Sequence, residues 1–376
     1  MFYPIWGREG IDQNTIDQMD CAANLPVAVG GALMPDAHLG YGLPIGGVLA
    51  TEEVIIPYAV GVDIACRMRV SIFNIDPKEL EHYQGHFSEV LEKGTYFGVG
   101  VTNPTEPDHP VLHEDWGVSL VTAEHKEMAR KQLGTSGSGN HFAEWGSITN
   151  GRETMVALMT HSGSRGCGAK VCNLYSKVAK AMRPEYGELA WLDLDSDQGL
   201  EYWDSMQLMG RYATANHDVI HDTIAGLISA KPVAVVENHH NFAWKEMHNG
   251  REVIVHRKGA TPAGRGVVGV IPGSMGTRSY IVEGLGNPDS LCSSSHGAGR
   301  VMSSKQAKKT FCYEDEVAAL AKQGVTVLSA GADEVCGVYK DIRKVMRAQQ
   351  DLVKIRETFI PKIVKMAPAK KRRWEK

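Results

Sequence analysis

The chain has 376 residues, of which 43% are hydrophobic and 22% are charged. These proportions are ordinary for globular proteins and exclude a disordered, fibrous or coiled-coil chain. Forty basic against forty-four acidic residues give a formal net charge of -4, so the overall charge does not indicate a nucleic-acid partner. The seven cysteines are scattered, and neither a leader-like opening nor a membrane-spanning segment is predicted, so we expect a reducing, cytoplasmic location.

Taken in chain order, hydrophobic periodicity and turn residues predict alternating helices and strands. Helices are expected at 13–19, 77–91, 202–228, 315–322 and 340–349. Strands are expected at 53–57, 69–73, 232–236, 253–256 and 325–328. Pro77 suits the first turn of its helix, and no linker rich in proline or serine separates the segments. The pattern indicates a mixed α and β protein.

Asp63 and Cys66 lie three residues apart, directly after a strand-like run that ends at Val62. A lone cysteine in a reducing compartment is more often a small buried hydrophobe than a metal ligand, and a lone histidine is more often structural. Further donors adjoin glycine, serine or asparagine at expected strand or loop ends, namely His141, His161, His239 and His240. A thiolate, three imidazoles and a carboxylate are too many for one tetrahedral ion but suit two ions that share the thiolate. Ligand softness alone favours zinc.

Two other groups are less specific. Asp36 and His38 follow a proline and could add a carboxylate, orient a ligand or simply form a turn. His217 and His221 have the i, i+4 spacing of a zinc pair on the predicted long helix. Neither a glycine-rich segment nor a carboxylate partner accompanies them, so we expect both to be surface or boundary residues rather than ligands.

The segment 257–300 combines cations, hydroxyl side chains and a lone histidine. His296 follows three serines and precedes a Gly-Ala-Gly turn that ends at Arg300. Such a histidine is sterically open, and its neutral imidazole could attack a phosphorus atom. The alternative is a histidine that only satisfies the hydrogen bonds of a buried turn.

Taken together, these segments resemble the RtcB family of GTP-dependent RNA ligases, in order from Pro35 to Lys365. The resemblance rests on Pro-Asp-Ala-His-Leu-Gly, Gly-Val-Asp-Ile-Ala-Cys, Gly-Ser-Gly-Asn-His-Phe, His-Ser-Gly-Ser-Arg-Gly, His-His-Asn-Phe, Arg-Lys-Gly-Ala, Pro-Gly-Ser-Met-Gly-Thr and His-Gly-Ala-Gly-Arg. It implies an α+β fold in which central β-sheets surround a metal cleft and helices lie outside. It also implies a single catalytic domain over 1–365, followed by a basic, flexible tail at 366–376. That tail is either a solvated terminus or an arm that touches RNA.

The resemblance also implies roles for individual residues. Two manganese ions, in place of zinc, would be held by Asp63, Cys66, His141, His161 and His240, with Cys66 as the bridge. His296 would become guanylylated by GTP. The nucleotide would contact Asn140, Asn241, Ser274, His296, Gly297, Ala298, Gly299, Arg300, Tyr339 and Lys365. The transfers to Tyr339 and Lys365 rest on short local matches.

The implied activity joins an RNA 3′-phosphate or 2′,3′-cyclic phosphate end to a 5′-hydroxyl end, in RNA repair or tRNA splicing. It proceeds through a histidine-GMP intermediate and an RNA 3′ end activated by GMP, and an archease-type protein is an expected activator. Ala65 and Arg67 flank Cys66 where family members often have glycine. We interpret these differences as signs of a specialised RNA-repair member in which Arg67 alters the approach of RNA.

Two other classes of function remain open from the sequence. A metal-dependent phosphoesterase or nuclease would use the same ligands without a covalent nucleotide. An RNA-binding or damage-sensing protein would keep the fold without turnover. His296 separates the first of these from a ligase, because only the ligase needs a histidine nucleophile.

Overall fold

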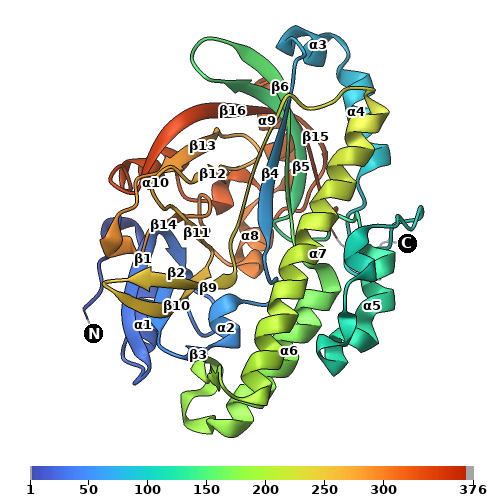
Figure 1. The fold of residues 1–376 in the computed structure, drawn as a ribbon. Helices are drawn as coiled ribbons and strands as arrows, with labels where there is room; N and C mark the ends of the chain where they lie inside the picture. The colour runs from blue at the N-terminus through green and yellow to red at the C-terminus, as the bar shows by residue number, and fades with distance from the viewer. Residues whose placement is uncertain (1, 370–376) are drawn as a thin grey trace.

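A computed structural model describes residues 2–369 (Figure 1). Its strands are β1 (Ala28–His38), β2 (Ile45–Thr51), β3 (Val54–Ile55), β4 (Arg67–Phe73), β5 (Phe142–Thr149), β6 (Thr154–Ser162), β7 (Leu192–Asp193), β8 (Ala234–His239), β9 (Phe242–His248), β10 (Arg251–Lys258), β11 (Ala260–Pro262), β12 (Val268–Ile271), β13 (Ser279–Gly284), β14 (Ser293–Ser295), β15 (Thr326–Ser329) and β16 (Val353–Met366). Its α-helices are α1 (Gln13–Ala23), α2 (Pro57–Val60), α3 (Pro77–His82), α4 (Gln84–Gly94), α5 (Leu120–Gln132), α6 (Arg165–Met182), α7 (Asp197–Leu227), α8 (Ser304–Thr310), α9 (Tyr313–Lys322) and α10 (Ile342–Arg347). Much of the segment predicted to be a flexible tail, from 370 on, lies outside the described residues.

The strands form one large sheet and one small one, which confirms the expected α+β class. The large sheet has eight strands in the order β12-β13-β16-β5-β6-β4-β8, with β15 parallel to β16. The small sheet has the order β1-β2-β10-β9, and α1 packs beside it (Figure 1). The short pairs β11-β14 and β3-β7 complete the strand pairing among the described residues.

The large sheet curls until its two outer strands, β8 and β12, meet. Asn238 of β8 closes the gap with its side chain, which accepts a hydrogen bond from the Val270 backbone NH at 2.9 Å and donates one to the Val270 carbonyl at 3.3 Å. Apolar side chains such as Met68, Met159 and Phe359 fill the inside of the curled sheet. The sheet is therefore close to a barrel, and the side-chain amide of Asn238 makes the hydrogen bonds that backbone pairing between β8 and β12 would make in a closed barrel.

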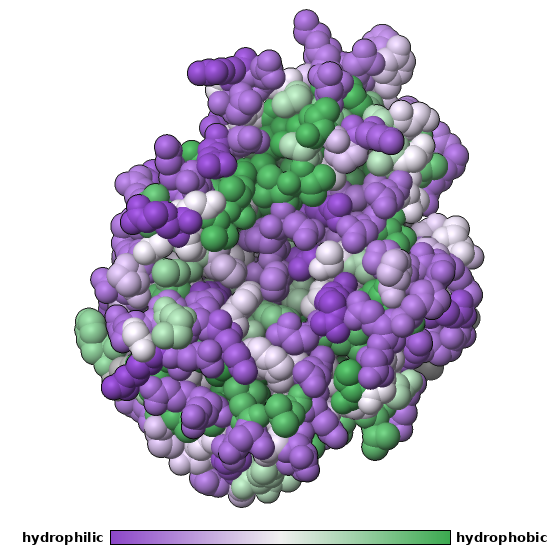
Figure 2. All heavy atoms as spheres, viewed as in Figure 1, coloured by the Kyte–Doolittle hydropathy of each residue, from purple (hydrophilic) through white to green (hydrophobic). Residues whose placement is uncertain are grey.

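Helices cover the outer face of the large sheet. The long α7 crosses β4 and β6, α4 packs against β5 and β16, and α5 and α6 pack beside α7 (Figure 1). Figure 2 shows a face that is mostly hydrophilic, with an apolar patch over the upper part of the large sheet. Among the described residues, no helix combines the length and apolar character that crossing a membrane requires.

The structure corrects several predicted elements. The strand predicted at 53–57 is confirmed only at Val54–Ile55, because Pro57 begins helix α2 and the run before Val62 is helical. The helix predicted at 77–91 is two helices, since Tyr83 leaves helical geometry between α3 and α4. The long helix and the strand that precedes the histidine pair are both confirmed, as α7 and β8.

His217 and His221 were wrongly expected near the surface. Both are buried between α7 and the large sheet, with relative exposures of 0% and 3%. Thr160 of β6 lies within hydrogen-bond distance of both rings, at 3.0 Å from His217 Nδ1 and 2.7 Å from His221 Nε2. Neither belongs to a group of three or more possible metal ligands among the described residues.

Candidate metal and nucleotide site

Chain segments far apart in the sequence bring the candidate ligands to one end of the large sheet. His141 directly precedes β5, His161 is near the end of β6, Cys66 directly precedes β4, and His240 directly follows β8. These four strands are neighbours and antiparallel, so the start of one strand lies beside the end of the next. The register places Phe142 opposite His161. The strand pairing alone therefore gathers four of the five predicted ligands.

The ligand atoms form two groups that share Cys66. One group contains Cys66, His161 and His240, and the other contains Asp63, Cys66 and His141, with the ligand atoms of each group within 4.8 Å of one another. The Cys66 Sγ lies 3.1 Å from His161 Nε2 and 3.3 Å from His141 Nε2. The second group is completed by Asp63 Oδ2, at 3.0 Å from His141 Nε2. This is the arrangement expected for two cations bridged by one thiolate.

Backbone contacts orient two of the imidazoles for metal binding. His141 Nδ1 lies 3.0 Å from the Ser136 carbonyl, and His161 Nδ1 lies 3.2 Å from the Asn140 carbonyl. A carbonyl can only accept, so each Nδ1 carries the proton and each Nε2 presents a lone pair to the cluster. The donor set and its orientation thus fit metal ions.

The electrostatics of the cluster also favour bound cations. Burial lowers the pKa of His161 and of His240 well below the usual range, so both rings are neutral ligands. Burial would raise the pKa of Asp63, but the contact with His141 and the nearby Arg165 lower it overall. Burial and the Asp63 carboxylate raise the pKa of the Cys66 thiol, and a bound cation would counter both effects.

A network of polar contacts supports the cluster from behind. Asn216 of α7 is fully buried, and its side chain accepts from Gly134 NH at 2.8 Å and donates to the Thr135 carbonyl and to Ser162 Oγ, both at 3.0 Å. Arg165 in turn donates to Ser162 Oγ at 2.8 Å. These contacts connect the loop before His141 to the end of the strand that carries His161.

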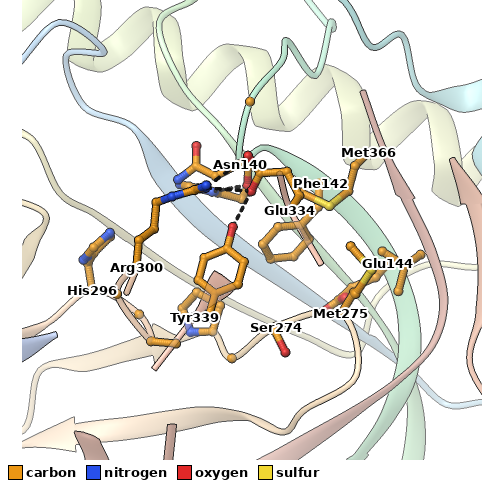
Figure 3. Close-up of a pocket in the computed structure, with 18 of the residues that line it drawn as sticks. Asn140, Phe142, Glu144, Ser274, Met275, His296, Arg300, Glu334, Tyr339 and Met366 are labelled. Atoms are coloured by element: carbon orange, nitrogen blue, oxygen red, sulfur yellow. Dashed lines mark hydrogen bonds and ion pairs between the residues drawn. The ribbon is translucent and has the colours of Figure 1, made fainter. Parts of the chain in front are cut away.

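His296 stands in the wall of a cavity of about 300 Å³ beside this cluster (Figure 3). Its ring centroid lies 4.8 Å from that of His240. His161 and Asn140 line the same cavity, as do Ser274, Gly297, Ala298, Gly299, Arg300 and Tyr339. Eight of the ten residues predicted to contact a nucleotide therefore surround one space.

Asp36 holds His296 in a single orientation. The Asp36 carboxylate is fully buried, and its Oδ2 lies 2.7 Å from His296 Nδ1. The same oxygen accepts from the backbone NH groups of His296 and Gly297 at 3.2 and 3.3 Å. Of the roles considered for Asp36, the structure supports orientation of a neighbouring side chain, and that side chain is His296.

Gly299 has a φ of 73°, and a Cβ there would clash with the Asp36 backbone oxygen, so the close approach of this turn requires glycine.

Arg300, Glu334 and Tyr339 form a second fixed group in the wall. Arg300 Nη1 lies 3.2 Å from Glu334 Oε1, and the Tyr339 hydroxyl donates to Glu334 (Figure 3). Burial raises the pKa of Glu334 despite the neighbouring Arg300. Burial and Glu334 raise the pKa of Tyr339, which therefore remains a neutral phenol. Sequence reasoning identified Arg300 and Tyr339 but missed the carboxylate that joins them.

Comparisons with known proteins give the family. The model of the family described as tRNA-splicing ligase RtcB matches residues 18–115 and 111–366. RNA-splicing ligase RtcB of Escherichia coli K12 is 35% identical, with 86% of each chain covered. RNA-splicing ligase RtcB1 of another Escherichia coli strain is 36% identical, also with 86% of each chain covered. tRNA-splicing ligase RtcB of Thermococcus kodakarensis is 30% identical over 91% of this chain and 90% of the relative.

The chain belongs to the RtcB family. The resemblance found in the sequence motifs is thereby confirmed, and with it the assignment to the RNA ligases. Within this RtcB-family chain, two of the residues expected beside the nucleotide lie outside the cavity wall. Asn241 supports the loop that carries Asp63 instead, because its side chain donates to the Asp63 carbonyl at 3.2 Å and accepts from Gly259 NH at 2.8 Å.

Lys365 is the other predicted contact that the structure does not bring to the cavity. Its ammonium group donates to the carbonyls of Leu91, Glu92 and Thr95 at 3.1 to 3.2 Å, at the C-terminal end of α4. Its neighbours Val364 and Met366 line the cavity instead, because alternate residues of a strand face opposite sides.

Arg67 does not have the position that we expected from its place beside Cys66. Its side chain lies under α7, where it donates to Thr214 and pairs with Glu237 at 3.4 Å. Only 5% of the residue is exposed. The interpretation that Arg67 alters the approach of RNA is therefore wrong, since the guanidinium group is held beneath a helix.

Glu144 is a cavity residue that sequence reasoning missed. It lies on β5 and faces the cavity, and its side chain has no hydrogen bond or ion pair with any described residue. Burial raises its pKa to about 8. In Figure 3, Glu144 and His296 lie on opposite sides of the cavity. The alternation of β5 could have identified it, because Phe142 and Glu144 must face the same side.

Proposed function

We propose that this RNA ligase uses GTP and two manganese ions to join RNA 3′-phosphate or 2′,3′-cyclic phosphate ends to 5′-hydroxyl ends. Asp63, Cys66, His141, His161 and His240 would hold the ions, which when bound would neutralise and position phosphate oxygens. The observation that carries the proposal is the contact of His296 with the buried Asp36, next to the ligand cluster. A hydrolase that used the same cluster would form no covalent bond between His296 and a nucleotide, and this difference is what the labelling experiment below measures.

In the first step, His296 acts as a nucleophile toward the α-phosphorus of GTP. The Asp36 carboxylate accepts the Nδ1–H hydrogen bond, so in the neutral ring Nε2 carries the attacking lone pair. The Nε2–P bond forms as the bond to pyrophosphate breaks. The Asp36 carboxylate stabilises the positive charge that develops on the ring, which stays in place through the contacts of Asp36 with the backbone.

Two further displacements complete the reaction. An oxygen of the RNA 3′-phosphate attacks the phosphorus of the bound GMP, and the N–P bond breaks, which returns the electron pair to His296. A 2′,3′-cyclic phosphate must first be opened by water to give that 3′-phosphate. The 5′-hydroxyl of the second RNA end then attacks the 3′-phosphorus, loses its proton to water, and expels GMP. Arg300 lines the cavity beside His296 and provides a cation for these phosphates.

Glu144 is the group that we propose for recognition of guanine. Guanine presents two adjacent N–H donors, at N1 and at the 2-amino group, and a carboxylate accepts such a pair well. Glu144 and His296 lie on opposite sides of the cavity, so a nucleoside bound there would lie between them (Figure 3). Adenine offers no equivalent pair of donors, so this carboxylate accounts for a preference for GTP.

We further propose a cytoplasmic location and activation by an archease-type protein. A bridging thiolate must remain reduced to bind metal, which agrees with the seven free cysteines of the chain.

The residues 1–365 are proposed to act as one catalytic domain. Whether the substrate comes from RNA repair or tRNA splicing is tested by comparing the sealing of cleaved tRNA or ribosomal RNA with that of spliced tRNA halves.

The first experiment tests the covalent intermediate. The protein is incubated with GTP labelled at the α-phosphate and with manganese, with and without an archease, and then denatured and separated by electrophoresis. We expect label on the wild type and none on His296→Ala. Asp36→Asn keeps the size of the side chain but removes its charge, and we expect it to label at least about tenfold more slowly.

The same experiment also tests the alternative function, a metal-dependent hydrolase. If His296→Ala keeps all phosphodiester chemistry and the wild type never becomes labelled, the ligase mechanism is wrong and a phosphoesterase is favoured. Retention of label by His296→Ala would place the nucleotide on another residue.

A further inference from the structure

A groove of about 550 Å³ lies between helix α10 and strands β13 and β16. It shares no lining residue with the His296 cavity. Arg343 and Arg347 come from α10, and Lys354 comes from the start of β16. The groove is thus built by parts of the chain that the reaction described above does not use.

The charge of this groove differs from that of the chain as a whole. Three of its lining residues are cations and none is a carboxylate, although the chain has a formal net charge of -4. Within the described part of the chain, Arg347 and Lys354 form no ion pair. Lys344, the next exposed residue of α10, also lacks one. A groove lined by cations of which Arg347 and Lys354 have no ion-pair partner is suited to a polyanion.

Two carboxylates near these cations, Asp341 and Glu283, already have partners. Asp341 caps the start of α10 and pairs with Arg343 at 3.1 Å. Glu283 lies opposite Lys354 in the sheet but pairs with Arg356 at 2.8 Å. Neither carboxylate therefore neutralises Arg347 or Lys354 by an ion pair.

The groove is connected to the catalytic cavity through one hydrophobic cluster. Tyr280, Met346 and Val353 form part of the groove wall and belong to the same cluster as Ala298, the second residue after His296. Tyr339 of the cavity wall packs against this cluster and lies three residues before α10. A ligand bound in the groove would thus be held at a fixed position relative to His296.

We propose that this groove binds the phosphodiester backbone of the RNA at a distance from the ends that are joined. The proposal rests on the proposed function, because only a substrate longer than the cavity would reach the groove. Tyr280 is only 7% exposed and offers little surface for stacking of a base. The groove therefore contributes affinity that depends on salt and length but not on sequence.

The test compares two substrates of different length with a double variant. Arg347→Ala/Lys354→Ala removes the unpaired cations, and Lys177→Ala/Lys180→Ala makes the same change of net charge on exposed positions of α6. The long substrate is a broken stem-loop of about 40 nucleotides, and the short one is a pair of ends of about five nucleotides each. Sealing is measured with both substrates, and self-guanylylation is measured with labelled GTP. RNA binding is measured by fluorescence anisotropy at salt concentrations from roughly 50 to 300 mM, which gives the slope of log affinity against log salt.

For the groove variant we expect a roughly three- to tenfold higher KM for the long RNA and an unchanged rate of guanylylation. The slope of log affinity against log salt should flatten by about 1.4 to 1.8, the loss of two phosphate contacts. Neither the short substrate nor the α6 variant should show these changes. An unchanged affinity for long RNA, or an equal loss with short RNA, would overturn the proposal.

The groove and the ligase mechanism can fail separately. If no protein becomes guanylylated, the proposed reaction fails, but the anisotropy measurement still tests RNA binding in the groove. If guanylylation is normal and the groove variant binds long RNA as the wild type does, only the groove proposal fails. An acidic protein partner would then be the better candidate for this surface.

Discussion

At the scale of single residues, Glu144 combines two properties that are rarely found together. It is buried, which raises its pKa to about 8, and it has no partner among the described residues. Below pH 8 the side chain is therefore mostly protonated in the free protein. Donors from a bound guanine favour the carboxylate, so binding of the nucleotide must release a proton whenever the pH is below that pKa.

This linkage predicts that the affinity for GTP rises with pH. From pH 6 to pH 8 we expect an increase of up to about tenfold per unit, since one proton is released for each nucleotide bound. Isothermal titration with the His296→Ala protein measures binding without guanylylation. The phosphates of GTP also titrate with pH, so a control is needed. In Glu144→Gln the side chain cannot titrate, and the pH dependence of GTP affinity in this variant is subtracted from that of the protein with Glu144. Equal slopes for the two proteins would contradict the assignment.

At the scale of elements, helix α7 acts on the metal site through one side chain. Asn216 contacts both the loop that precedes His141 and Ser162, which follows His161. It touches no ligand atom, and we therefore regard it as a positioning residue. Removing it leaves buried polar groups without partners on both sides of the cluster.

For Asn216→Ala we expect the manganese concentration that gives half-maximal guanylylation to rise by roughly ten- to a hundredfold, as for the loss of other groups that orient metal ligands. The free energy of unfolding should also fall, by about 1–3 kcal/mol. Ser205→Ala is the matched control, because Ser205 is equally buried in α7 and bonds to Ser119 at 2.8 Å. If the two variants lose stability alike and neither changes its manganese requirement, Asn216 has only a structural role.

At the scale of the whole molecule, the sequence was informative where local pattern and position coincide. His240 follows a strongly apolar strand, and the strand end alone suggested a site. The sequence could not indicate that β5, β6, β4 and β8 are neighbours, since this order depends on pairing between distant segments. The motif resemblance supplied that information indirectly, by naming ligands from all four strands.

Contacts between distant segments account for what sequence reasoning missed. Asp36 and His296 are separated by 260 positions, and their contact is decided by the packing of the small sheet against the turn after β14. His217 and His221 were misplaced because helical periodicity cannot show that the sheet below offers Thr160 and Ser71 as polar partners. A short match to Lys365 likewise carried no information about which face of β16 its side chain occupies.

The last prediction concerns metal ions and the stability of the whole fold. Four of the five candidate ligands come from the ends of four strands, so ions that bind only the folded chain must stabilise it. At a hundred times the dissociation constant the gain is about 2.7 kcal/mol for each site, which should raise Tm by several degrees. Thermal unfolding with manganese and with EDTA measures this difference.

The two ligand groups give this measurement a sharper form. Because Cys66 belongs to both groups, Cys66→Ala should abolish the manganese-dependent rise in Tm. Asp63→Ala and His240→Ala each damage one group, so each should keep part of the rise, and the double variant should lose it. A full response in Cys66→Ala would show that the thiolate does not bridge two ions. A complete loss in either single variant would mean that the two sites fill only together, because the shared thiolate couples them.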